Sequence, residues 1–345
     1  MIKRILYTLL IMFPVVASAQ INTDRVMAIG RNALYFEDYV LSIQYFNQVI
    51  NAKPYLSDPY FYRGLAKINL DDFQGAESDC SEAIERNPFV VSAYQVRGLA
   101  RIQQNNFAGA IEDYTKALEF DPENIGVWHN MALCRIRQED YKGAKNDLDK
   151  LIAISPRYTK AYLMRGEVDL KQKDTLAAEK DFGKAIEIDR YDADTWASRA
   201  ILRLQQQRYK DAEADFDHAI RLSTRNSGVY INRALARYHQ NNLRGAMSDY
   251  DIALDIDPNN FIGHYNRGLL RAQVGDDNRA IQDFNFVIEM EPDNMMAIFN
   301  RGLLLDQTGD YKGAIKDYST VINEYPNFLL GYQYRAQARR KIGDV

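Results

Sequence analysis

The stretch GAIEDYTKALEFDP, residues 109–122, recurs in altered form as GAIKDYSTVINEYP at residues 313–326. The two copies lie 204 residues apart, which is six times 34, and 34 residues is a length at which paired helices stack as repeats. Proline marks the same period at Pro54, Pro88, Pro122, Pro156, Pro258, Pro292 and Pro326, and the two missing members are Arg190 and Thr224. The repetition therefore predicts a solenoid of similar units and not a set of separate globular domains.

Small residues recur at two places within the repeat. Counting back from the prolines puts nine full repeats at residues 23, 57, 91, 125, 159, 193, 227, 261 and 295, and a partial tenth from 329 to 345. The eighth residue is Gly30, Gly64, Gly98, Ala132, Gly166, Ala200, Ala234, Gly268, Gly302 or Ala336. The twentieth is Ser42, Ala76, Ala110, Ala144, Ala178, Ala212, Ala246, Ala280 or Ala314. Because helices approach closely only where side chains are small, we expect these positions to face each other at each hairpin crossing.

Aromatic residues recur between the small ones. The fourth residue is Tyr60, Tyr94, Trp128, Tyr162, Trp196 or Tyr230, and the twenty-fourth is Phe46, Tyr114, Phe182, Phe216, Tyr250, Phe284 or Tyr318. Together with the small residues and the proline, these positions resemble the tetratricopeptide repeat over residues 23–345. The resemblance implies an all-α fold, a right-handed superhelical solenoid of antiparallel helical hairpins.

Helix starts are marked by side chains that can accept backbone N–H groups. Asp or Asn precedes the second helix of six repeats, at Asp72, Asn106, Asp140, Asn242, Asp276 and Asp310. An oxygen at this place satisfies an amide that the helix itself leaves without a partner. Asp58, followed by Pro59, is expected to do the same for a first helix.

Two charged positions also follow the period. The seventh residue is Arg63, Arg97, Arg165, Arg199, Arg233, Arg267, Arg301 or Arg335, with Met131 as the exception. The twenty-third is Asp79, Asp113, Asp147, Asp181, Asp215, Asp249, Asp283 or Asp317. We expect the two series to pair between helices, since the first repeat lacks both. Pairing within a repeat leaves Asp147 alone, whereas pairing to the next repeat leaves Asp113 alone. The alternative is that the arginines bind an anionic ligand, such as a glycan.

The amino terminus and the composition bear on where the protein acts. Residues 1–19 combine Lys3 and Arg4, an apolar run and a small-residue cleavage site before Gln20. This pattern predicts a bacterial-type signal peptide, hence export to the periplasm, the cell surface or the medium, with no membrane span after cleavage. The chain is 46% hydrophobic and 26% charged, and its net charge of -4 is too small to indicate a nucleic-acid partner.

Residues with chemical potential are few and scattered. Cys80 and Cys134 fall at different places in different repeats, so we expect two small buried side chains and no disulfide. The four histidines show no metal-ligand spacing, and no nucleophile or phosphate-binding motif is present. We therefore expect no catalytic site, no metal and no cofactor.

The resemblance implies a binding surface, because in that family the first helices line the inner, concave face. Asparagine recurs there at the sixth position in Asn232, Asn266 and Asn300, with Asn130 earlier. An amide carries both a donor and an acceptor, so it can bond a peptide unit without reading its sequence. The predicted peptide-binding surface is completed by Tyr265, Phe299, Leu235, Leu269 and Leu303.

Two other interpretations stay open at this point. The asparagines are also common in that family on a solvated surface that binds nothing. The solenoid could alternatively be the docking module of a larger enzyme or sensor, whose active domain would lie beyond Val345.

Overall fold

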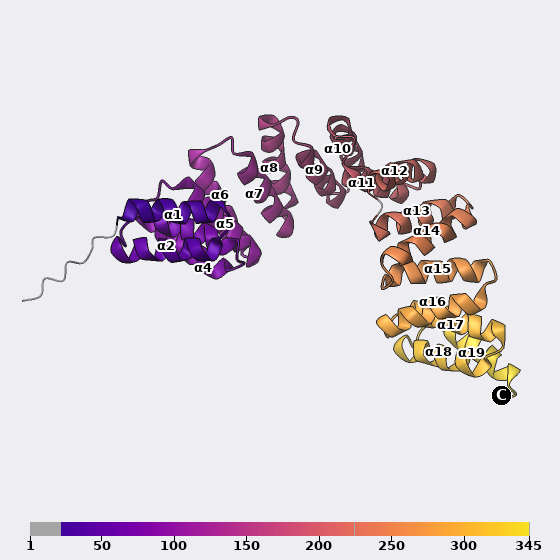
Figure 1. Cartoon of the computed structure of the whole chain (residues 1–345). Coiled ribbons are helices and arrows are strands. Elements are labelled where there is room, and N and C mark those ends of the chain that lie inside the picture. Colours follow the sequence, from indigo (N-terminus) through magenta and orange to yellow (C-terminus); the bar gives the residue numbers. More distant parts are fainter. Residues whose placement is uncertain (1–21, 224, 345) are drawn as a thin grey trace, which may run out of the picture. The chain divides into compact units, whose positions relative to one another are not determined.

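The computed structural model describes residues 22–223 and 225–344. The signal peptide predicted at residues 1–19 lies outside this part of the chain. Within it, every regular element is an α-helix, which confirms the all-α repeat fold (Figure 1). The odd-numbered helices are α1 (Thr23–Tyr35), α3 (Asp58–Ile68), α5 (Val91–Gln103), α7 (Ile125–Arg137), α9 (Thr159–Lys171), α11 (Ala193–Gln205), α13 (Ser227–His239), α15 (Phe261–Gln273), α17 (Met295–Thr308) and α19 (Leu329–Lys341). The even-numbered helices are α2 (Tyr39–Ala52), α4 (Phe73–Arg86), α6 (Phe107–Phe120), α8 (Tyr141–Ile154), α10 (Thr175–Ile188), α12 (Tyr209–Leu222), α14 (Leu243–Ile256), α16 (Asp277–Met290) and α18 (Tyr311–Glu324).

The helices group into two compact units. The first ends at Ser155 and contains α1 to α8, and the second begins at Pro156 and contains α9 to α19. Within each unit, an odd-numbered helix packs on the even-numbered helix that follows, which packs in turn on the next odd-numbered helix (Figure 1). Several consecutive odd-numbered helices also contact each other, as α15 and α17 do. The odd-numbered helices therefore form the more closely spaced layer of each unit.

The hairpin crossing differs from the expected meeting of two small residues. A Cβ atom built on Gly98 would lie 2.7 Å from Cε1 of Tyr114, and one built on Gly166 would lie 2.6 Å from Cε1 of Phe182. In most repeats that have glycine at the eighth position, this residue therefore faces the aromatic ring at position 24 of its own repeat. The edge of this ring occupies the space that a side chain at the eighth position would need. Gly64 is the exception, because it faces Cys80 and the Ala76 carbonyl.

Capping side chains define most of the even-numbered helices. Asp72 accepts from the Gly75 amide at 2.9 Å, and equivalent bonds begin α6, α8, α14 and α18. Two expected caps are wrong. Asp276 makes no capping bond to α16, and Asp58 is the first residue of α3, whose N-cap is Ser57.

The turn between the two helices of a hairpin requires a left-handed backbone at the fifteenth position. The residues with positive φ are Glu37, Asp71, Asn105, Glu139, Lys173, Gln207, Asn241, Gly275, Gly309 and Gly343. Seven of these ten are not glycine, so most turns hold a side chain in a conformation that costs about 1 kcal/mol relative to glycine.

Both cysteines are buried and free, as expected. Cys80 packs among Ala83, Ala93 and Val96, and burial raises the pKa of its thiol to about 12. Burial likewise raises the pKa of Cys134 to about 11. These raised pKa values disfavour the thiolate near neutral pH, the form that acts as a nucleophile.

Candidate functional site

The arginine and aspartate series pair within each repeat. Nε of Arg233 lies 3.0 Å and Nη2 lies 2.6 Å from the two carboxylate oxygens of Asp249, a residue that is 1% exposed. The same two-bond arrangement joins Arg63 to Asp79, Arg97 to Asp113, Arg165 to Asp181, Arg199 to Asp215, Arg267 to Asp283 and Arg301 to Asp317. The structure thus decides between the two pairings left open by the sequence. The expectation that this pairing leaves Asp147 alone is wrong, because Arg135 forms an ion pair with it.

The remaining guanidinium nitrogen reaches the preceding repeat. Nη1 of Arg97 donates to Ser81 Oγ at 3.1 Å, and Nη1 of Arg233 donates to Asp217 at 2.6 Å. Further contacts of this kind join Arg63 to Asn47, Arg267 to Asp251, Arg301 to Asn285 and Arg335 to Ser319. Each of these arginines therefore links its own odd-numbered helix to the even-numbered helix before it.

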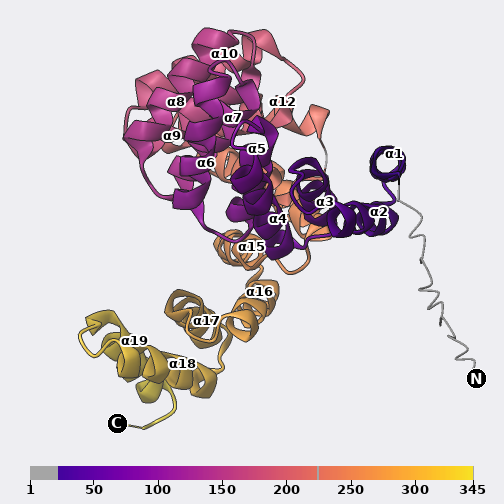
Figure 2. The ribbon, with the colours of Figure 1, turned by 90° about the vertical axis from the view of Figure 1, so that its left-hand side faces the viewer.

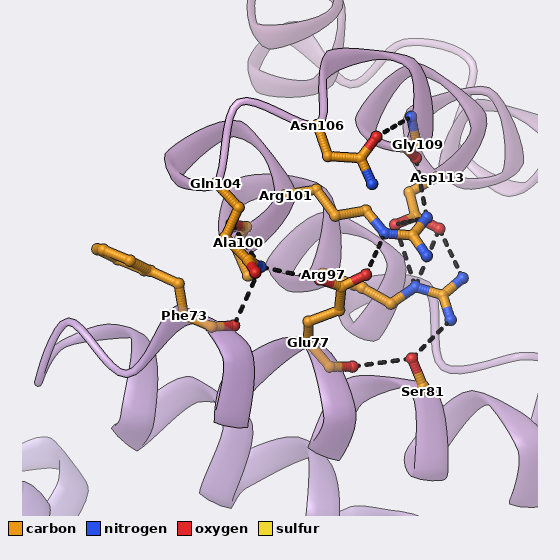
Figure 3. A network of polar contacts seen from close by, with 10 residues as sticks. All are labelled: Phe73, Glu77, Ser81, Arg97, Ala100, Arg101, Gln104, Asn106, Gly109 and Asp113. Carbon is orange, nitrogen blue, oxygen red and sulfur yellow. Dashed lines mark hydrogen bonds and ion pairs between the residues drawn. The ribbon is translucent and has the colours of Figure 1, made fainter.

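A second cation that sequence reasoning missed completes the network. At the eleventh position, Nη1 of Arg101 donates to Asp113 at 3.0 Å, and its Nε donates to Glu77 of the preceding repeat at 2.8 Å (Figure 3). Equivalent residues that contact the buried aspartate are Lys67, Arg135, Arg203, Arg237 and Arg271. Although burial raises the pKa of Glu77, hydrogen bonds from Arg101 and Gln104 leave it below its ordinary value.

The fourth repeat departs from this pattern. Asp147 is 1% exposed, Met131 replaces the arginine, and Arg135 Nε lies 2.8 Å from Asp147 Oδ2 without the alignment of a hydrogen bond. Burial raises the pKa of Asp147 to about 6. In contrast, the pKa of Asp283 is lowered despite its burial, because His264, Arg267 and Arg271 surround that carboxylate. The opposite pKa shifts of Asp147 and Asp283 thus accompany the absence and the presence of the seventh-position arginine.

The nine residues predicted to bind a peptide divide between the two units. Asn130 lies on α7 in the first unit. The other eight belong to three successive odd-numbered helices of the second unit, namely Asn232 and Leu235 on α13, Tyr265, Asn266 and Leu269 on α15, and Phe299, Asn300 and Leu303 on α17. All nine are partly accessible, and Leu269 is 39% exposed. Their role in binding stays a prediction.

The asparagines of the second unit are not equivalent. Nδ2 of Asn300 donates to the Tyr265 hydroxyl at 3.1 Å, so two predicted site residues from adjacent repeats hold each other in place. Among the residues that the structure describes, the amides of Asn232 and Asn266 make no hydrogen bond. An amide that is half-buried and has no partner within the protein remains available to a ligand.

A cavity that the sequence did not reveal opens beside Phe299. It measures about 320 Å³ and is lined by Asp293, Asn294, Met295, Met296, Phe299, Val321, Tyr325 and Phe328. These residues come from the start of α17, the end of α18 and the turns next to them, and Figure 2 shows α17, α18 and α19 grouped at the carboxyl end. No local sequence pattern predicts that the start of α17, the end of α18 and the turns next to them enclose a cavity.

The histidines of the second unit serve as flat packing surfaces. His218 stacks on Trp196 with ring centroids 4.3 Å apart, and His264 stacks on Phe286 at 4.0 Å. Over residues 22–223 and 225–344, no group of three His, Cys, Asp or Glu side chains could hold a metal ion. In the same residues, no helix has the length and apolar character needed to cross a membrane.

Comparison with known proteins assigns the repeat. Sequence models described as TPR repeat or tetratricopeptide repeat match residues 98–134, 125–158, 159–192, 198–261 and 265–327. The chain is a tetratricopeptide repeat protein. Proteins of this family generally mediate protein–protein interaction, and none of the matched models describes a catalytic family. No curated protein matches the sequence.

Solved tetratricopeptide repeat structures share the fold. A tetratricopeptide repeat protein from Parabacteroides merdae is 21% identical with a TM-score of 0.56, over 72% of this chain and 98% of that chain. The C-terminal part of a TPR repeat-containing protein from Cytophaga hutchinsonii is 17% identical with a TM-score of 0.56, over 69% of this chain and 97% of that chain. At these identities the likeness establishes the fold alone.

Proposed function

We propose that this tetratricopeptide repeat protein is a non-catalytic scaffold that binds an extended peptide, or an extended segment of a partner protein, along its odd-numbered helices. One observation carries the proposal: the Asn232 and Asn266 amides lie half-buried on neighbouring odd-numbered helices and have no hydrogen-bond partner among the described residues. Each amide can donate to a peptide carbonyl and accept from a peptide N–H.

The surroundings of these amides suit a polypeptide ligand. Leu235, Leu269 and Leu303 stand three residues after the asparagines, so they lie next to them on the same helix faces. Leucine ridges beside amides give a surface that takes apolar side chains and satisfies a backbone. The bond between Asn300 and Tyr265 orders the next part of this surface before any ligand arrives.

The charged residues argue against an anionic glycan as the ligand and against catalysis by the recurring aspartates. The seventh-position arginines are neutralised by buried aspartates, which leaves little positive charge to hold an anionic glycan. The same pairing withdraws the recurring aspartates from acid–base chemistry, since catalysis requires polar groups that converge on a substrate. A scaffold requires neither unpaired arginines nor convergent catalytic groups.

We further propose that the protein acts outside the cytoplasm, in the periplasm or at the cell surface. The support is the pattern of residues 1–19, in which basic residues, an apolar run and a small-residue cleavage site follow one another. Detection of a mature chain that begins at Gln20 in an envelope fraction would test this.

The binding proposal is tested with two asparagine variants. Partners of the purified chain are selected from a phage-displayed random peptide library, and the selected peptides are titrated by fluorescence anisotropy. Asn232→Ala and Asn266→Ala should each weaken binding by about tenfold, the effect of losing about one or two good hydrogen bonds. Asn278→Ala, on the exposed surface of α16, is the matched control and should bind normally. Unchanged affinity in both test variants, with unchanged melting temperature, would contradict the proposal.

A further inference from the structure

Two adjoining cavities open at the turn between α16 and α17. The first is the apolar cavity of about 320 Å³ beside Phe299. The second measures about 480 Å³ and is lined by Glu291, Pro292, Asp293 and Asn294. Both linings include Asp293 and Asn294, so the two cavities adjoin at these residues.

The apolar cavity is built on a fixed floor. The Phe299 ring packs edge-on against Phe328 with centroids 5.0 Å apart, and it also contacts Tyr318 and Tyr334 at 5.8 Å. The rim is accessible, because Met296 is 64% exposed. A floor held by three aromatic neighbours with a flexible thioether at the rim suits a bulky apolar side chain.

The second cavity carries negative charge without a counter-charge. Asn294 Nδ2 donates to Glu291 Oε2 at 3.1 Å, and Asn294 Oδ1 accepts from the Ala297 amide at 3.0 Å, so the turn and the Glu291 carboxylate are held in place. Neither Glu291 nor Asp293 forms an ion pair with a basic residue in the described part of the chain. Two carboxylates that lack a cation complement a lysine or arginine on a ligand.

The apolar character is particular to the last repeats. Two apolar residues begin α15, α17 and α19, namely Phe261 and Ile262, Met295 and Met296, and Leu329 and Leu330. The corresponding residues of α13 are Ser227 and Gly228. The cavity therefore lies within an apolar strip that α13 does not continue.

We propose that these cavities anchor a peptide segment in which a bulky apolar side chain and a lysine or arginine stand two residues apart. In an extended chain, side chains two residues apart point to the same face at a spacing of about 7 Å, which suits two cavities that adjoin. The apolar side chain occupies the Phe299 cavity, and the cation lies between Glu291 and Asp293. This inference rests on the proposed function and adds the class of ligand.

The test uses four synthetic peptides and two methionine methyl groups as local probes. The peptides are nine residues of alternating serine and glycine that carry Phe-Ser-Arg, Phe-Ser-Glu, Ala-Ser-Arg or Ala-Ser-Glu at the centre. The chain is labelled with ¹³C at its methionine methyls and followed by NMR. Met295 and Met296 line the cavity, whereas Met290 is 52% exposed outside it and serves as the internal control.

We expect the Phe-Ser-Arg peptide to shift the Met295 and Met296 resonances at a concentration about tenfold lower than any other peptide requires. The Met290 resonance should stay in place. In Asp293→Lys the charge preference should reverse, so that Phe-Ser-Glu becomes the best ligand. Met296→Ser should weaken Phe-Ser-Arg binding, and Met290→Ser should not.

Equal titration of the four peptides, or an arginine preference that survives Asp293→Lys, overturns the inference. The results that would contradict the proposed function are different from those that would contradict the anchor site. If library peptides bind and lose affinity in Asn266→Ala while Met295 and Met296 do not respond, the scaffold function stands and the anchor site is wrong. If no library peptide binds and the four synthetic peptides shift no methionine, both are wrong.

Discussion

Restoring the missing arginine of the fourth repeat should stabilise the protein and change its pH dependence. In Met131→Arg, the new guanidinium would stand where other repeats place the partner of the buried aspartate. Burial of the new charge should be incomplete, because the side chains of Arg233 and Arg301 keep 12% and 22% exposure at the same position. In the second repeat, Ser81 accepts the third hydrogen bond of Arg97. Thr115 is the corresponding residue of the third repeat, so its hydroxyl could accept the same bond from an arginine at position 131.

The magnitude follows from the proton on Asp147. Burial raises the pKa of this carboxyl from 3.8 to about 6. Between these pH values the folded protein holds a proton on Asp147 that the unfolded chain releases. The contribution of this carboxyl to stability is therefore largest below about pH 4 and is lost as the pH rises through about 6. One pKa unit corresponds to about 1.4 kcal/mol, so the two-unit shift amounts to about 3 kcal/mol at most. Met131→Arg should recover about 1–3 kcal/mol of this at neutral pH.

Urea denaturation at about pH 4.5 and about pH 7.5, with hydrogen exchange of the α7 and α8 amides to localise the effect, provides the assay. The wild type should lose stability in α7 and α8 between the two pH values, and Met131→Arg should lose much less. Met131→Leu keeps the buried apolar volume without the charge and should follow the wild type. A variant Met131→Arg that is less stable at the higher pH, or that keeps the full pH dependence, would refute the role assigned to the arginine.

Three further predictions test the repeat itself. Arg233→Ala and Asp249→Ala should each cost about 3–5 kcal/mol, because each leaves a buried charge without its main partner, and the double variant should cost less than the sum; additive losses in urea denaturation would argue against the pairing. Gly98→Leu should cost about 1–3 kcal/mol by overpacking against Tyr114, whereas Gly98→Ala, which copies the alanine of other repeats, should cost less; equal melting temperatures would contradict the crossing geometry. Gln207→Gly should stabilise by up to about 1 kcal/mol by relieving a positive φ, and a lower melting temperature would count against that strain.

The sequence predicted the repeat better than the polar network inside it. The period of 34 residues places the arginines and aspartates in two regular series, so pairing between helices could be predicted from spacing. Spacing left open whether Asp113 pairs with Arg97 or stays alone, and the hydrogen bonds between the two residues settle this. The eleventh-position cations escaped notice because Asp169 and Leu305 interrupt the series that contains Arg101. The contact of the eighth residue with an aromatic ring was also missed, because it depends on the direction in which the Tyr114 side chain points. Residue spacing predicts the helix face on which a side chain lies, but not the atoms that the end of the side chain contacts.

The candidate site divides in the same way. Asn232, Asn266 and Asn300 could be found because they repeat, but nothing in the repeat distinguishes Asn300, whose amide is bonded to Tyr265. The cavity beside Phe299 has no periodic signal at all. It arises because one repeat combines Met296 at a helix start with Tyr325 at a turn, two residues that only the folded hairpin brings together.

The series of seventh-position arginines also affects how the repeats unfold. Arg97 bonds to Asp113 in its own repeat and to Ser81 in the one before, so separating the two repeats breaks bonds to a side chain that also supports a buried aspartate. In a solenoid, such contacts between neighbours are what make separate repeats fold together. Met131 is the single interruption of this series between Arg63 and Arg335. It removes the seventh-position arginine that elsewhere bonds back to the preceding even-numbered helix, and it leaves Asp147 with Arg135 as its cationic partner. The coupling between repeats three and four therefore relies on the apolar packing around Tyr114 and Val127 without a seventh-position arginine, and we expect α7 and α8 to open earliest in the first unit.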